Sequence, residues 1–230
     1  MEVAERNLQH VHGRIAAACT ACGRPVRSVT LLAVSKTFPA EAVRRMHGAG
    51  QSAFGENYVQ EALEKIEALA DLRAALEWHL IGPLQSNKTR PVAEAFDWVH
   101  SVDRLRIAER LAAQRPAGLA PLQVCLQVNI DDETSKSGLA PQDVPALARA
   151  VAALPEDRLR LRGLMAIPRP ADDAASRRRP LAALRELMAA LQAQGLPLDT
   201  LSMGMSNDLE DAIAEGSTMV RVGTALFGRR

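Results

Sequence analysis

Strand-like and helix-like segments alternate along most of this 230-residue chain, and this alternation constrains the fold more than any other feature. Short apolar runs, often closed by polar or glycine-containing loops, predict strands, and a helical segment separates each run from the next. The predicted strands are 31–36, 52–54, 77–81, 98–102, 122–130, 161–167, 200–203 and 219–222. The predicted helices are 2–21, 39–49, 58–74, 86–95, 103–114, 141–153, 180–194 and 207–214.

Regular alternation implies parallel strands joined by right-handed crossovers. We therefore predict an α/β fold, a single (β/α)8 TIM barrel over residues 1–230, with an extra helix at residues 2–21. An open doubly wound sheet is the alternative, but Ser35-Lys36-Thr37 follows the first strand where a dinucleotide site would have its glycine fingerprint. In a barrel, functional groups gather where the strands end.

Composition excludes several classes of protein. A formal charge of +1 gives no field that would attract nucleic acid, and Arg177-Arg178-Arg179 is expected in a solvated turn. No apolar run approaches bilayer length and the N-terminus is charged, so we expect a cytoplasmic protein without a membrane partner. Cys19 and Cys22 have the spacing of a zinc or redox pair, but no second pair completes four ligands, and we expect no metal.

Lys36 is the candidate for covalent chemistry. The chain has 28 basic residues, of which only Lys36, Lys65, Lys88 and Lys136 are lysines. Lys36 stands at the tip of the first predicted strand, where a partly desolvated amine can attack an aldehyde to form a Schiff base. The alternative is a lysine that extends into solvent from a strand end.

The last two strand ends offer an anion site. Ser202 to Ser206 follow the seventh strand, and Gly223 with Thr224 follows the eighth, where barrels often hold phosphate. The alternative is that the glycines only make turns. Arg221 alternates with Val220 and Val222, so it points to the opposite face. If that face is the barrel interior, its guanidinium needs an acceptor such as a ring nitrogen; on the surface it would need none.

Six ordered motifs resemble the pyridoxal phosphate homeostasis protein family, which is itself similar to the N-terminal barrel of alanine racemase. The motifs are 33–37, 54–61, 78–82, 84–88, 201–206 and 216–228. The resemblance implies pyridoxal 5'-phosphate as cofactor, bound as a Schiff base on Lys36. It also implies that Ser202 or Ser206, with Gly223 and Thr224, contacts the phosphate and that Arg221 contacts the pyridine nitrogen.

Other positions in these motifs leave alternatives open. Asn57 and His79 are candidates for lining the pocket, and a structural role for each is an equal alternative. Many members of the family carry a second lysine two residues after the Schiff-base lysine, where this chain has Phe38, so any relay through that lysine is in doubt. Lys136 lies in the loop after the fifth strand, as a site residue or a solvated charge.

The resemblance implies an intracellular carrier or buffer of pyridoxal phosphate, with the cofactor and the apoenzymes that receive it as partners. We expect a monomer. Because an arginine keeps its proton, the pyridine nitrogen stays unprotonated and the ring is a poor electron sink. Racemisation also needs two acid–base groups, and the tyrosine that supplies the second in similar racemases belongs to a separate domain that we do not expect here. The alternatives are a racemase-like enzyme and a Schiff-base aldolase without a cofactor.

Overall fold

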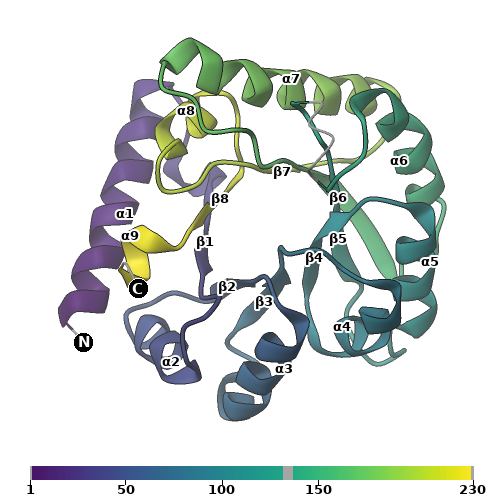
Figure 1. The fold of residues 1–230 in the computed structure, drawn as a ribbon, viewed down its shortest axis with the longest axis horizontal. Helices are drawn as coiled ribbons and strands as arrows, with labels where there is room; N and C mark the ends of the chain where they lie inside the picture. Colours follow the sequence, from purple (N-terminus) through teal and green to yellow (C-terminus); the bar gives the residue numbers. More distant parts are fainter. Residues whose placement is uncertain (1, 132–136, 229–230) are drawn as a thin grey trace.

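Parallel strands form a closed barrel in the computed structural model, which describes residues 2–131 and 137–228. The strands pair in sequence order, and β1 also pairs with β8, which closes the barrel (Figure 1). Their bounds are β1 Thr30–Val34, β2 Ala53–Glu56, β3 Glu77–Leu80, β4 Trp98–Val102, β5 Leu122–Gln127, β6 Leu159–Met165, β7 Thr200–Ser202 and β8 Met219–Val222. The predicted barrel is confirmed.

Helices surround the strands and follow them in turn (Figure 1). Their bounds are α1 Glu2–Ala21, α2 Ala40–Gly48, α3 Val59–Ala68, α4 Thr89–Ala95, α5 Leu105–Gln114, α6 Val144–Ala152, α7 Ala174–Ala193, α8 Leu209–Ala214 and α9 Thr224–Phe227. Short 3-10 turns are η1 Val26–Ser28, η2 Ala70–Leu72, η3 Ser86–Lys88 and η4 Pro141–Asp143.

The N-terminal helix completes the ring. It buries one apolar stripe that includes Leu8, Val11 and Ile15, and it lies between α8 and α2 beside the short α9 (Figure 1). Asn7 Nδ2 donates to the Leu226 carbonyl oxygen at 2.9 Å, which ties the two ends of the chain together. Because α9 has only four residues, α1 covers the outside of the barrel where a longer last helix would otherwise lie.

Side chains along each strand alternate between two faces, one packed against the helices and one turned toward the inside of the barrel. Val220 and Val222 belong to the main apolar core between the strands and the helices, so Arg221 points into the barrel. Inside the barrel, Trp98, Cys125 and Met165 form a small apolar cluster that lies beside buried polar side chains. The barrel interior is thus partly polar, and the site is built on it.

Two local predictions are corrected. Strand β2 continues to Glu56, beyond the predicted 52–54, because the Glu56 carboxylate is buried and bonded rather than solvated. Helix α7 begins at Ala174, where Asp173 caps it by accepting from the Ser176 N–H at 2.9 Å. The solvated turn expected at residues 177–179 is therefore wrong: Arg177 and Arg178 lie in α7, and both pair with Asp211 of α8 at 2.7 Å.

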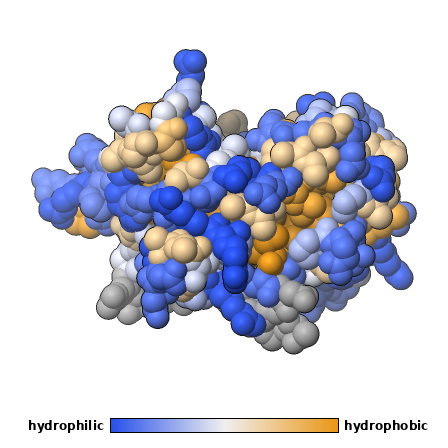
Figure 2. Space-filling view, turned by 90° about the horizontal axis from the view of Figure 1, so that it is seen from above, coloured by the Kyte–Doolittle hydropathy of each residue, from blue (hydrophilic) through white to orange (hydrophobic). Residues whose placement is uncertain are grey.

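The surface on the side that α7 covers is mostly hydrophilic, with hydrophobic side chains visible in a hollow in the right half of the view (Figure 2). Arg178 of α7, whose side chain is half exposed, pairs with Asp211 of α8. Among the residues that the structure describes, no helix combines the length and the apolar character that crossing a bilayer requires.

Candidate functional site

Lys36 lies two residues past the end of β1, at the C-terminal mouth of the barrel. The strand that delivers it is buried from Leu31 to Val34, whereas Lys36 itself is half-buried. Within the described part of the chain, its ammonium makes no hydrogen bond and no ion pair. The amine at this end of the barrel is therefore not engaged by a described residue, as a nucleophile requires.

A buried ion cluster bonds the backbone on both sides of Lys36. Lys65 of α3 is only 5% exposed, and its Nζ donates to the Ser35 carbonyl oxygen at 2.7 Å, to Glu56 Oε1 at 2.8 Å and to Glu61 Oε1 at 2.6 Å. Ser35 Oγ also donates to Glu56 Oε1, at 2.6 Å. We name Ser35, Glu56, Glu61 and Lys65 the Lys65 cluster. It joins the residue before Lys36 to β2 and α3.

The residue after Lys36 is fixed by the same cluster. Thr37 adopts a left-handed backbone conformation, with φ of 65°, which a β-branched residue takes only at a cost of about 1–3 kcal/mol. Its N–H donates to Glu61 Oε1 at 2.5 Å. Both peptide groups that flank Lys36 are thus bonded to the Lys65 cluster, which fixes the direction in which the Lys36 side chain leaves the backbone.

Glu56 is the most deeply buried carboxylate of the cluster. Burial raises its pKa, while the hydrogen bond and the charge of Lys65 act in the opposite direction. Its second oxygen, Oε2, is buried and has no partner among the described residues. The charged form of Glu56 therefore depends on Lys65.

Arg221 lies in β8 with its guanidinium inside the barrel. Its Nη1 donates to the carbonyl oxygen of Ser202 at 2.5 Å and to Ser202 Oγ at 2.7 Å, and its Nη2 donates to the Ala166 carbonyl oxygen at 2.8 Å. Burial lowers the pKa of Arg221 to about 10, so it remains protonated at neutral pH. A guanidinium has five N–H donors, and three are used here, which leaves two without a partner among the described residues.

The two candidate serines differ in availability. Ser202 is fully buried, and its hydroxyl contacts both Arg221 and His100 Nδ1, the latter at 2.8 Å. Ser206 is half-buried and Thr224 is exposed, and neither hydroxyl is bonded to a described residue. A hydroxyl that is free at the rim can reach a bound anion, whereas the Ser202 hydroxyl is already engaged by the protein.

The loop after β8 approaches the end of β1 closely. A Cβ at Gly223 would lie 3.3 Å from the Val34 carbonyl oxygen and 3.4 Å from the Val34 side chain, which is tighter than most such contacts. Gly223 therefore lets β8 end against the strand that carries Lys36. Thr224, the next residue, shares this rim with the lysine.

The other predicted residues have different positions. His79 is fully buried inside the barrel, with Nε2 2.7 Å from Glu77 Oε1 and Nδ1 2.9 Å from His100 Nε2, so both of its ring nitrogens face protein partners. Asn57 follows β2, and its buried Oδ1 has no partner among the described residues. Phe38 stacks on Phe227 with ring centroids 5.0 Å apart. Lys136 lies outside the described residues.

Sequence reasoning missed the Lys65 cluster and His100. Glu61 and Lys65 are four residues apart in α3, a spacing that places them on one helix face and could have signalled an ion pair. His100 has the same parity in its strand as Trp98, which places it on the interior face. Nothing in the local sequence connects either residue to Lys36 or to Arg221.

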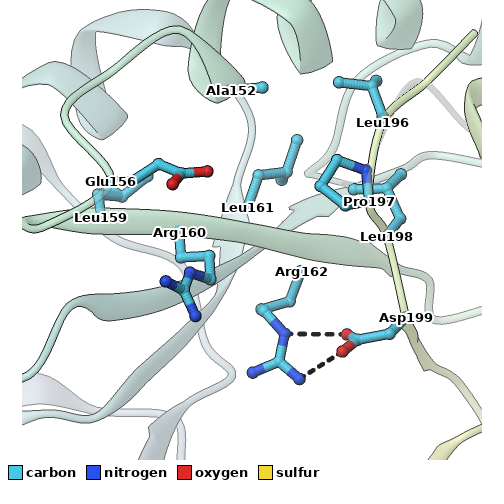
Figure 3. A pocket seen from close by; sticks show the side chains of 10 residues that line it. All are labelled: Ala152, Glu156, Leu159, Arg160, Leu161, Arg162, Leu196, Pro197, Leu198 and Asp199. Carbon is cyan, nitrogen blue, oxygen red and sulfur yellow. Dashed lines mark hydrogen bonds and ion pairs between the residues drawn. The ribbon is translucent and has the colours of Figure 1, made fainter.

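A cavity of about 410 Å³ lies at the opposite end of the barrel, where β6 begins and where the chain enters β7 (Figure 3). Arg162 and Asp199 line it and are joined by an ion pair at 2.6 Å. None of the predicted site residues lines this cavity, so it is separate from the site around Lys36.

Comparison with known proteins gives consistent matches. Residues 7–230 match the family described as alanine racemase, N-terminal domain. A pyridoxal phosphate homeostasis protein of Pseudomonas aeruginosa is 62% identical over 230 residues, which cover 100% of this chain and 97% of that protein. A pyridoxal phosphate homeostasis protein of Escherichia coli K12 is 56% identical over 225 residues, which cover 97% of this chain and 95% of that protein. The structure of PipY of Synechococcus elongatus with PLP bound has a TM-score of 0.80 and 43% identity, covering 95% of this chain and 100% of that one.

Proposed function

The chain belongs to the pyridoxal phosphate homeostasis protein family, and from that premise we propose that it binds pyridoxal 5'-phosphate and carries it within the cell. The cofactor supplies a reactive aldehyde when it is bound. The protein holds that aldehyde as a Schiff base on Lys36 and releases it to apoenzymes. PipY, whose structure contains PLP, supports the cofactor assignment because it matches this chain over nearly its whole length.

One observation carries the proposal. The Lys36 amine has no partner among the described residues, while both peptide groups beside it are fixed by the Lys65 cluster. Arg221, in the neighbouring strand β8, has two N–H donors that bond no described residue, and we assign them to a neutral ring nitrogen. This donor set fits pyridoxal phosphate, which presents an aldehyde carbon, a pyridine nitrogen and a phosphate.

The phosphate is assigned to the rim. We place it against the hydroxyls of Ser206 and Thr224 and the backbone at Gly223, because the Ser202 hydroxyl is already bonded to Arg221 and close to His100. Ser202 then acts on the cofactor through Arg221 rather than by direct contact.

Substitution of a phosphate-contacting hydroxyl should weaken binding of the phosphorylated ligand alone. Loss of a hydrogen bond to a charged group removes about 1.5–3 kcal/mol, so we expect Thr224→Ala and Ser206→Ala to bind pyridoxal phosphate roughly tenfold to a hundredfold more weakly. Titration of each variant with pyridoxal phosphate and with pyridoxal measures this effect. Equal losses for the two ligands would contradict the phosphate assignment. Thr20→Ala, at an exposed threonine of α1, is the matched control and should alter neither affinity.

The proposed carrier does not turn over amino acids efficiently. Racemisation requires one positioned group on each face of the α-carbon, and Lys36 can serve only one face. The sole tyrosine, Tyr58, is 57% exposed and its hydroxyl contacts no described residue, so nothing in the described part of the chain positions it. A positioned acid–base group contributes typically 10²- to 10⁴-fold, and its absence leaves slow background exchange.

Incubation of the loaded protein with L-alanine in D₂O tests this expectation. We expect α-deuteration and D-alanine to form far more slowly than the roughly 1–10³ per second of ordinary enzymes. Lys36→Ala and Tyr58→Phe are the controls. Racemisation within that range, lost in both variants, would establish a racemase and overturn the carrier proposal.

A further inference from the structure

A continuous line of polar side chains crosses the barrel interior from Glu77 to Arg221. Glu77 Oε1 lies 2.7 Å from His79 Nε2, and His79 Nδ1 lies 2.9 Å from His100 Nε2. His100 Nδ1 is 2.8 Å from Ser202 Oγ, which accepts from Arg221 Nη1 at 2.7 Å. His79, His100 and Ser202 are fully buried, whereas Glu77, at the start of β3, reaches the end of the barrel opposite Lys36.

The two ends of the line determine its direction. The hydrogen bond from His79 holds the pKa of Glu77 below its usual range, so Glu77 is ionised and can only accept. Arg221 can only donate. His79 Nε2–H therefore donates to Glu77, and in the proposed direction His79 Nδ1 accepts from His100 Nε2–H. His100 Nδ1 in turn accepts from the Ser202 hydroxyl, and burial lowers the pKa of His100 well below its usual value, which keeps the ring neutral.

The middle of this line is shielded from water, since His79, His100 and Ser202 are fully buried, whereas the Glu77 side chain at its end is half exposed. Trp98 stacks on the His79 ring, with centroids 5.3 Å apart and planes 10° from parallel. The Arg162 guanidinium lies 4.9 Å from the centroid of the Trp98 ring, and Arg162 also lines the cavity of Figure 3. In the buried part of the line, each hydrogen bond polarises the next, so the bonds strengthen one another.

The line also contributes to compensating the charge of Arg221, beside the electrostatic attraction of Asp208. Its three hydrogen bonds go to neutral oxygens, and no carboxylate among the described residues forms an ion pair with it. A buried cation requires electrostatic compensation. Here the aligned dipoles of Ser202, His100 and His79 end on the negative charge of Glu77.

We propose that Glu77, His79, His100 and Ser202 form a one-directional hydrogen-bond relay that positions the Arg221 guanidinium for the ring nitrogen of the bound cofactor. The four are positioning residues, since they act through Arg221. The proposal rests on the proposed function for the contact between Arg221 and the cofactor, but the direction of the relay is a property of the protein alone.

The direction is measured first, in protein without ligand. Nitrogen-15 NMR of the imidazoles distinguishes protonated from unprotonated ring nitrogens, and the chain has only five histidines to assign. We expect His79 and His100 each to carry one proton, on Nε2. A proton on Nδ1 of His100 would mean that the relay runs the other way, and would overturn the proposal.

The positioning role is measured with two ligands, pyridoxal phosphate and its analogue in which carbon replaces the ring nitrogen. Glu77→Gln retains an acceptor for His79 but removes the charge, and Ser202→Ala removes the hydroxyl that joins Arg221 to His100. We expect each to weaken binding of pyridoxal phosphate about threefold to tenfold and to leave the analogue unaffected. Glu156→Gln, a carboxylate that lines the cavity at the same end of the barrel, is the matched control and should alter neither affinity.

The outcomes separate the two proposals. Equal losses for both ligands would show that the relay only stabilises the fold, and would overturn the positioning role while the carrier proposal stands. A wild-type protein that binds neither ligand would overturn the proposed function, and with it the role assigned to Arg221. Loss confined to pyridoxal phosphate, with Nε2 protonated in both histidines, supports the relay.

Discussion

Lys36→Ala is expected to abolish covalent capture of pyridoxal phosphate altogether. In the wild-type protein, borohydride reduction should attach the cofactor irreversibly to Lys36, because this amine is free at the barrel mouth while Lys65 is bonded to three oxygen acceptors. Peptide mass mapping after reduction identifies the modified residue. Four lysines in the sequence make the map simple to interpret.

Two controls complete this experiment. Lys88→Met removes an exposed lysine that has no partner in the described part of the chain, and should leave labelling of Lys36 unchanged. Label on a lysine other than Lys36 in the wild-type protein, or full labelling in Lys36→Ala, would refute the assignment. Non-covalent binding through phosphate and Arg221 should persist in Lys36→Ala, at reduced affinity.

Lys65→Met is expected to have the largest effect on stability. Removal of one partner from a buried ion cluster leaves an uncompensated charge and typically reduces the free energy of unfolding by about 3–5 kcal/mol. Here the charge is the Glu56 carboxylate, which is fully buried and whose Oε2 already has no partner among the described residues. Urea denaturation of the ligand-free protein measures the loss, with Lys88→Met as the matched exposed control.

The pH dependence identifies the cause of that loss. Without Lys65, its hydrogen bond and its charge no longer lower the pKa of Glu56, and only the hydrogen bond from Ser35 still does, so burial raises the folded-state pKa further above the unfolded value of 4.5. The folded variant then binds more protons than its unfolded chain, and its free energy of unfolding falls as pH rises above about 4.5. The free energy of unfolding of Lys65→Met should therefore fall further below that of the wild-type protein at pH 8 than at pH 5.

A second substitution tests the same explanation. Glu56→Gln combined with Lys65→Met removes the buried charge and should recover part of the stability and most of the pH dependence. A Lys65→Met variant as stable as Lys88→Met, or one with a pH-independent deficit, would contradict the view that the Lys65 cluster supports the segment around Lys36.

The sequence by itself determined the barrel, the position of Lys36 after β1 and the placement of Arg221 on the strand face opposite Val220 and Val222. These features follow from periodicity: apolar residues recur every two positions in a strand and every three to four in a helix, and both periods are legible without knowledge of the rest of the chain. The predicted start of α7, residue 180, is wrong because the helix begins earlier, after the Asp173 cap.

Only the tertiary structure decided what surrounds those residues. His100 and Ser202 are 102 positions apart, and Lys65 is 30 positions from Ser35, so no local pattern records either contact. Closure of the barrel makes β1 and β8 neighbours and turns the interior face of each strand toward the same axis. A buried polar group must find its partner across that axis, and the geometry of closure selects the partner. For this reason the sequence could name Lys36 and Arg221, while the Lys65 cluster and the relay through His100 emerged only from the folded barrel.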